Sequence, residues 1–531
     1  MKSKSFAGLR SQSRAPSRRS SPKSHREHFL HSLPAYSGPC SVSYLEFEIP
    51  VRKPRHFSHI KRNGSPALKL DTVLFSIYYL CDTAPSLSRP PWLPRPRPET
   101  CNILSVPGVL VTAYLALTSM FTKLPAYRNA PLSRRRPASA TGGGDGPTSS
   151  SSNSSSTTLP NNRQFEKRVS NEQSGKPPIF PIVIFSHGLG GSRTSCSAIC
   201  GELASLGFVV VALEHRDGSG ARIFINKAGA AEEGGQEKEG DSTQNILYDT
   251  SPHNKRGIDT ELRGAQMEMR LAEIEEAFYV LGSINAGHGE QLREQNLRKA
   301  GNVGLYLGSV TVMGHSFGGT TAAQALRLDK FGWVGQAVLL DPWGPVLKTF
   351  QKPILSVGSE AFMHWTECYE RIQQICREAR DVGALCWSMT IKGSTHISQT
   401  DFARAIHLTI YSALEFLKIT LPPQRTKFDA SKEQLLSNAA DPETNALFDH
   451  RPKDHKFIAA RLFIPDEFSL RIRGFIKRCN RWGNRDPNLP TDASGKPLVG
   501  PVNWGAGKDM LVHMAPEQED MEAYMRRAGG Q

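Results

Sequence analysis

Short apolar runs alternate with helix-forming stretches between residues 179 and 420. The runs are rich in Val, Ile and Leu, and they predict buried strands. They lie at 179–185, 208–213, 310–313, 336–340, 353–357 and 386–391. Helices are predicted between and after them, at 195–206, 260–281, 320–328 and 402–417. The alternation predicts an α/β fold, which is a mostly parallel sheet with helices on both faces.

The chain before this region has a different pattern. Residues 1–38 are rich in Ser, Arg and Pro and have no acidic residue before Glu27, so they are predicted to form a disordered basic tail. Alternating polar and apolar positions at 42–49 predict a strand, and a branched and aromatic run at 70–79 predicts a second, longer one.

Polar segments interrupt and follow the α/β region. Residues 133–178 contain an Arg triplet, a Gly triplet and a Ser/Thr/Asn tract, and are predicted to be flexible. This segment is either a linker between two domains or a loop inserted into one. Residues 225–257 are predicted to form an exposed polar insert. Beyond residue 421 the chain is polar, with one helix predicted at 466–479 and a loose tail after Asn480.

The charge is unevenly distributed. The 531 residues carry 65 Lys and Arg against 50 Asp and Glu, a formal net charge of +15. Residues 1–136 hold 22 of the cations and 6 of the anions, which leaves 43 against 44 in the remainder. Because the predicted α/β region is close to neutral, the excess indicates attraction to an acidic membrane surface or a role in localisation. No nucleic-acid partner is expected.

The cysteines, the apolar runs and the N-terminal segment argue against several classes of protein. Nine cysteines, an odd number without a CxxC pair, exclude a disulfide scaffold and indicate no zinc site. No run of 18 apolar residues is present. The N-terminus lacks the apolar core of a secretory signal, although its Arg- and Ser-rich start has features of a mitochondrial transit peptide. We expect an intracellular, cytoplasmic protein, with a mitochondrial or membrane-associated location as the alternatives. The stretch 109–121 predicts either a core helix or an apolar surface helix in contact with a membrane.

The motif Gly314-His315-Ser316-Phe317-Gly318 is the main candidate for chemistry. The motif alone is weak, but here it joins a predicted strand directly to a predicted helix. That context is typical of a nucleophile elbow, in which a sharp turn exposes the serine and small neighbours keep the backbone clear. Ser316 is therefore the candidate nucleophile.

A serine hydroxyl needs a base and an acid that orients the base. In α/β-hydrolases these follow the serine in the order acid, then histidine, each after a strand. Asp341 follows its strand directly, whereas the competing Glu360 lies three residues beyond the end of another strand. His396 lies just beyond the last strand and is the candidate base. His364 is the second choice, and His407 falls inside a helical pattern.

The oxyanion that forms during acyl transfer is usually stabilised by backbone N–H groups. The amide of Phe317, next to the nucleophile, is one candidate. The segment 185–190, Phe-Ser-His-Gly-Leu-Gly, ends a strand in a glycine-rich turn and offers the amide of Leu189 as the second. His187 and His315 are expected to shape these loops.

Five stretches in the same order resemble the platelet-activating factor acetylhydrolase family, the plasma and intracellular type II class of α/β-hydrolases. They are 70–79, 185–190, 203–217, 314–319 and 393–402. The resemblance implies an α/β-hydrolase fold with Ser316 as nucleophile, Asp341 as acid and His396 as base. It also implies that the amides of Leu189 and Phe317 form the oxyanion hole.

The resemblance also bears on domain organisation, because the family places a strand like 70–79 in the same sheet as the catalytic strands. It implies that 133–178 is an inserted loop and that 39–420 form a single domain. The remainder, 421–531, is then a C-terminal extension, partly helical and partly disordered.

The function implied is that of a serine esterase that hydrolyses the short or oxidised sn-2 acyl ester of a phospholipid, without a cofactor or metal ion. The long loop, the insert and the extension depart from the family pattern, so the reaction class is better supported than the substrate. One alternative is a carboxylesterase or lipase of broad specificity. A non-enzymatic alternative is a membrane-associated binding or scaffold module.

Overall fold

The computed structural model describes a discontinuous set of residues. They are 32–59, 61–62, 65–66, 68–82, 86–94, 119–133, 179–220, 260–289, 291–292, 305–344, 350–363, 365–392, 394–401, 406–422, 436 and 510–529. The predicted helix at 466–479, the insert at 225–257 and nearly all of 109–121 and 133–178 lie outside this set. Within it, no helix combines the length and apolar character needed to cross a bilayer.

A ten-stranded mixed sheet organises the chain, in the order β12-β11-β10-β9-β8-β6-β7-β4-β1-β5. The block from β11 to β7 is parallel, whereas β4, β1 and β12 join it by antiparallel pairing. The strands are β1 Ser41–His56, β4 Lys69–Cys81, β5 Tyr127–Arg128, β6 Phe180–Ser186, β7 Val209–Glu214, β8 Leu305–His315, β9 Val334–Leu340, β10 Ile354–Ser359, β11 Cys386–Ile391 and β12 Met510–Met514. A small separate pair, β2 Lys61–Arg62 and β3 Ser65–Pro66, lies in the excursion between β1 and β4.

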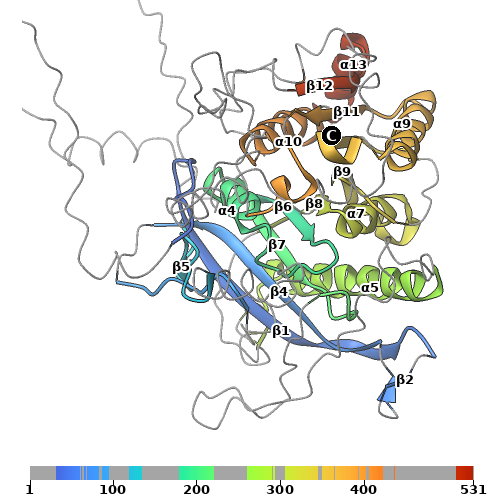
Figure 1. The fold of residues 1–531 in the computed structure, drawn as a ribbon. Helices are drawn as coiled ribbons and strands as arrows, with labels where there is room; N and C mark the ends of the chain where they lie inside the picture. The colour runs from blue at the N-terminus through green and yellow to red at the C-terminus, as the bar shows by residue number, and fades with distance from the viewer. Residues whose placement is uncertain are drawn as a thin grey trace, which may run out of the picture.

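Helices cover both faces of the sheet, as the sequence predicts (Figure 1). Alternate residues of β6 enter two different cores: Ile182 and Ile184 pack with α5 and α7, whereas Val183 and Phe185 pack with α4 and α10. A strand buried on both sides must be apolar throughout, which explains the continuous hydrophobic runs. The helices are α4 Ser197–Ser205, α5 Thr260–Asn285, α7 Phe317–Arg327, α8 Glu360–Met363, α9 Thr366–Asp381, α10 Ile406–Thr420 and α13 Gln518–Gly529, with short 3-10 turns η2 Asp329–Phe331 and η3 His396–Gln399.

The described ends of the chain differ from the sequence prediction. Residues 32–38, predicted as part of a disordered tail, contact the fold: the amide of Ser37 donates to the carboxylate of Glu202 in α4. The prediction of a loose tail after Asn480 is wrong for 510–529, because β12 pairs with β11 and extends the sheet. Helix α9, which the sequence reading did not predict, connects β10 to β11.

Candidate active site

Ser316 lies in the one-residue turn between β8 and α7, with a positive φ of 57° and 8% of its surface exposed. A side chain at either flanking glycine has no room. A Cβ on Gly314 would overlap the carbonyl of Gly318, and a Cβ on Gly318 would overlap the carbonyl of Ser186 at the end of β6. The elbow is therefore wedged between two strand ends, which accounts for the glycines of the motif.

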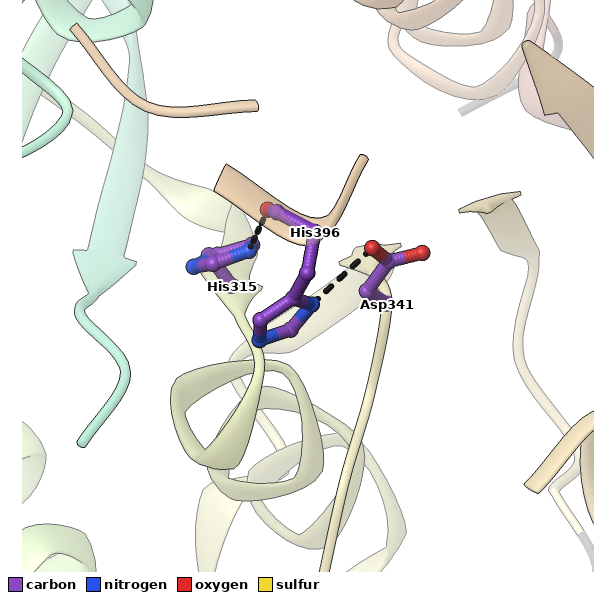
Figure 2. A group of neighbouring side chains, drawn as sticks. All are labelled: His315, Asp341 and His396. Atoms are coloured by element: carbon purple, nitrogen blue, oxygen red, sulfur yellow. Dashed lines mark hydrogen bonds and ion pairs between the residues drawn. The ribbon is translucent and has the colours of Figure 1, made fainter. Parts of the chain in front are cut away.

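Asp341 follows the last residue of β9 and also has a positive φ, 42°. Its side chain is fully buried, and Oδ2 accepts a hydrogen bond from Nδ1 of His396 at 3.0 Å (Figure 2). Ser359, the last residue of β10, donates to both oxygens of Asp341: its amide to Oδ1 and its hydroxyl to Oδ2, each at 2.6 Å. The carboxylate is thus fixed in position and oriented towards the imidazole.

His396 opens the turn η3, and its ring contacts two others. The ring of Phe362 stacks against it at 5.6 Å between centroids, and that of His315 lies 4.4 Å away on a tilted plane. Nε2 of His315 donates to the backbone carbonyl of His396 at 2.9 Å. Burial, and then proximity to His396, hold the pKa of His315 well below its usual value, so His315 stays neutral. His315 therefore contacts the backbone and the ring of His396 as a neutral side chain.

Ser316 and His396 are not joined by a hydrogen bond in the described structure. His315, the chain neighbour of Ser316, nevertheless packs on the His396 ring. Figure 2 shows the second ring nitrogen of His396 pointing away from Asp341. Catalytic hydrogen bonds are often long before substrate binds, so this geometry is compatible with a serine–histidine pair.

The glycine-rich turn after β6 lies against the elbow. A Cβ on Gly188 would come within 2.8 Å of Cβ of Ser316. The carbonyl of Gly188 accepts hydrogen bonds from the amide of Gly191 and from Nδ1 of His187. Neither the Leu189 amide nor the Phe317 amide donates to another group of the described chain. Within the part of the chain that the structure describes, both of these predicted donors are therefore unpaired.

The alternatives from the sequence lie elsewhere. Glu360 begins α8, and its backbone amide donates to Ser394. His407 is in α10, where its ring stacks on Tyr411 at 6.1 Å. His364 lies outside the described residues. The carboxylate that contacts the His396 imidazole is that of Asp341.

Donor atoms of His315, Asp341 and His396 lie within 4.8 Å of one another, close enough for a metal site. However, Nε2 of His315 and Nδ1 of His396 both donate hydrogen bonds. A ring nitrogen that carries a proton has no lone pair for a cation, so only the opposite nitrogen of each ring could bind one.

Sequence reasoning did not identify the groups that orient the candidate triad. Ser359 and Phe362 stand on β10 and α8, and nothing in their local sequence marks them. The stretch 214–217, Glu-His-Arg-Asp, is marked in the sequence only by the family resemblance. Its side chains are buried, and Asp217 pairs with Arg270 of α5, which in turn donates to the carbonyl of His187 in the turn after β6.

The fold is a mostly parallel sheet with helices on both faces, and the site combines a strand–serine–helix elbow with an acid and a histidine on the loops after later strands. Together these features define an α/β-hydrolase. A family model described as platelet-activating factor acetylhydrolase, isoform II, matches residues 156–433, just over half of the chain. The chain belongs to this family.

Two relatives are both named platelet-activating factor acetylhydrolase. The protein of Gallus gallus is 32% identical over 235 residues, which cover 42% of this chain and 53% of the relative. That of Cavia porcellus is 33% identical over 241 residues, covering 43% and 49%. The chain spans about half the length of these relatives. A solved structure, a ferulic acid esterase from Streptomyces cinnamoneus, has a TM-score of 0.44 at 14% identity over 73% of this chain and 92% of that one. The fold assignment rests on the topology above.

Proposed function

We propose that this protein is a serine-dependent ester hydrolase that removes short or oxidised acyl chains from the sn-2 position of phospholipids. The observation that carries the proposal is the Asp341–His396 hydrogen bond, held by Ser359 at the same edge of the sheet as the Ser316 elbow. Membership of the acetylhydrolase family supports the phospholipid substrate.

In the proposed mechanism, Oγ of Ser316 attacks the acyl carbonyl carbon while Nε2 of His396 accepts the hydroxyl proton. Asp341 keeps the other ring nitrogen protonated and stabilises the imidazolium that forms. The amides of Leu189 and Phe317 donate to the oxyanion of the tetrahedral intermediate.

The intermediate then collapses, and the ester C–O bond breaks. His396 gives its proton to the departing alkoxide, so the lysophospholipid leaves as an alcohol and the acyl group remains on Ser316. Water, deprotonated by His396, attacks this acyl-enzyme. A second collapse releases the carboxylic acid and returns the proton to Ser316.

The Ser316→Ala substitution tests the chemistry. Purified wild-type protein is expected to hydrolyse a short-chain phospholipid and to be labelled at Ser316 by a fluorophosphonate, located by peptide mass spectrometry. We expect Ser316→Ala to lower kcat by at least about 1,000-fold, because the covalent step is lost. Full activity in the variant, or labelling at another residue, would disprove the proposal.

A substrate panel tests the specificity. Phospholipids with sn-2 chains of increasing length are compared with a neutral short-chain ester at equal concentrations. A higher kcat/KM for the acetyl phospholipid supports the proposed substrate class. Equal or better hydrolysis of the neutral ester identifies a carboxylesterase of broad specificity instead.

A further inference from the structure

Arg270 is a buried cation beside the candidate oxyanion hole. It lies in the middle of α5 with no exposed surface. Its guanidinium has three polar partners: Nε donates to Asp217 at 2.6 Å, Nη1 to the backbone carbonyl of His187 at 2.7 Å, and Nη2 to the hydroxyl of Ser219 at 2.6 Å. The guanidinium also lies over the ring of Phe317, 4.6 Å from its centroid.

These contacts hold the backbone on both sides of Leu189, which carries one of the proposed oxyanion donors. On one side, His187 is separated from Leu189 only by Gly188, so a bond to the carbonyl of His187 fixes the peptide plane preceding Gly188. On the other side, the amide of Gly190 donates to the carbonyl of Ser219 at 2.7 Å, which fixes the plane following Leu189. The Leu189 amide is thus held between two anchored peptides.

The loop that supplies these anchors is itself tied to α5. Asp217 accepts from the amide and the hydroxyl of Ser219, and the carbonyl of Asp217 accepts from Gln266. Burial alone would raise the pKa of Asp217, but Arg270 and Ser219 outweigh it and hold that pKa below its usual value. Asp217 is therefore charged and orients the guanidinium.

We propose that Arg270 is the positioning residue of the oxyanion hole, aligning the Leu189 amide through the carbonyl of His187 and the Phe317 segment through its ring. This inference rests on the proposed function. Arg is needed for its shape as well as its charge, because a planar fork reaches several acceptors at fixed angles and a lysine ammonium does not.

The test is Arg270→Lys, which keeps the charge and lacks the fork. Displacement of oxyanion donors should lower kcat for 4-nitrophenyl acetate by about 10- to 100-fold while KM stays within about threefold. An alkyl trifluoromethyl ketone, which forms an oxyanion adduct with the serine, should bind more weakly by the same factor as kcat falls. The corresponding alcohol, which forms no adduct, should bind as before.

Arg216→Lys is the matched control. Arg216 is also buried and paired, with Glu48 and Thr72, and within the described residues none of its side-chain hydrogen bonds goes to His187 or Phe317. The Arg216→Lys variant should be less thermally stable than the wild type, and its ratio of ketone to alcohol affinity should equal that of the wild type. If Arg270→Lys behaves in the same way, the positioning role is refuted.

A second variant covers the case in which Arg270→Lys does not fold. Asp217→Asn leaves Arg270 in place and removes the charge that orients it, so a smaller loss with the same kinetic signature is expected. An unchanged ketone-to-alcohol ratio in folded Asp217→Asn contradicts the inference. If the proposed function itself were wrong, the result would look different, because the wild-type protein would then show no turnover that depends on Ser316.

Discussion

At the scale of single residues, the carboxylate of Asp341 is held by Ser359 as well as by His396. Both hydrogen bonds from Ser359 are at 2.6 Å, and all three side chains come from the loop ends of neighbouring strands or from the turn after β11. Asp341 also has a positive φ, an unfavourable conformation for a residue other than glycine. Such strain persists only where surrounding contacts enforce it, and Ser359 provides two of them.

Ser359→Ala should therefore impair catalysis more than folding. The variant loses the hydroxyl bond to Oδ2, together with the bond that this hydroxyl accepts from the amide of Phe362. It keeps the amide bond to Oδ1, so the carboxylate gains freedom to turn away from His396. We expect kcat to fall by about 10-fold, equivalent to one hydrogen bond of about 1.4 kcal/mol. Steady-state kinetics with 4-nitrophenyl acetate, beside circular dichroism, would measure this. Ser356→Ala, on the same strand and away from Asp341, is the control; equal losses in the two variants would argue against the role of Ser359.

At the scale of elements, helix α4 is capped by a residue from far along the chain. Cys196 at its N-cap forms no side-chain cap bond, and Asp401 accepts instead from the amides of Ser197 and Ala198. Asp401 also accepts from the indole of Trp92 at 2.8 Å and lies just after the turn that carries His396. One carboxylate thereby joins the helix that follows the glycine-rich turn to the loop of the candidate base.

This cap predicts a pH dependence of stability. Burial raises the pKa of Asp401 to about 7, although bonds from Ser197, Ala198 and Trp92 oppose the shift. The folded state therefore binds a proton that the unfolded state, with a pKa near the ordinary 3.8, has already lost. Its contribution to stability is complete below about pH 4 and is lost as the pH rises to about 7, by at most about 1.4 kcal/mol per pH unit.

Asp401→Asn isolates this contribution, because every other titrating group is common to both proteins. Urea unfolding at intervals from pH 4 to 8 should give a difference in free energy, wild type minus variant, that falls as the pH rises to about 7 and is flat above it. A difference that is constant with pH, or that grows with it, would show that Asp401 is ionised throughout this range in the folded protein.

At the scale of the whole molecule, the last part of the chain completes the sheet. Strand β12 pairs with β11, the strand that leads to His396, and places the buried side chain of Met510 in the core shared with α10. The next residue, Leu511, is also buried. A hydrogen bond of 2.8 Å joins Nε2 of His513 in β12 to the hydroxyl of Thr390 in β11. Without β12, the apolar strand β11 would be an exposed edge, which is prone to aggregation.

Truncation after residue 509 tests this role. Loss of two buried apolar side chains, each contributing about 1.5–3 kcal/mol, should lower the melting temperature by at least about 5 °C and promote aggregation. Differential scanning fluorimetry and light scattering would follow both effects. Truncation after residue 516 removes α13 and keeps β12, so it should retain more of the stability. Equal melting temperatures for the full chain and the 509 truncation would rule out a structural role for β12.

The sequence alone predicted the elements that depend on local pattern. Strands buried on both faces must be apolar along their length, and an elbow needs glycines where backbone meets backbone, so β6 to β11 and the Ser316 motif could be predicted from their residues. The order of Ser316, Asp341 and His396 along those strands then predicted which side chains would meet. For Asp341 and His396, the meeting is observed as a hydrogen bond.

Only the tertiary structure decided which distant groups hold these parts in place. Three of these groups, Ser359, Arg270 and Asp401, form hydrogen bonds with residues that lie 18 to 204 positions away in the chain. The fourth, β12, extends the sheet after a long polar stretch. No periodicity links such partners, because each is placed by the packing of a different element. The chain beyond Asn480 is polar enough to predict a loose tail, yet an unpaired sheet edge offers hydrogen bonds that a short strand can satisfy.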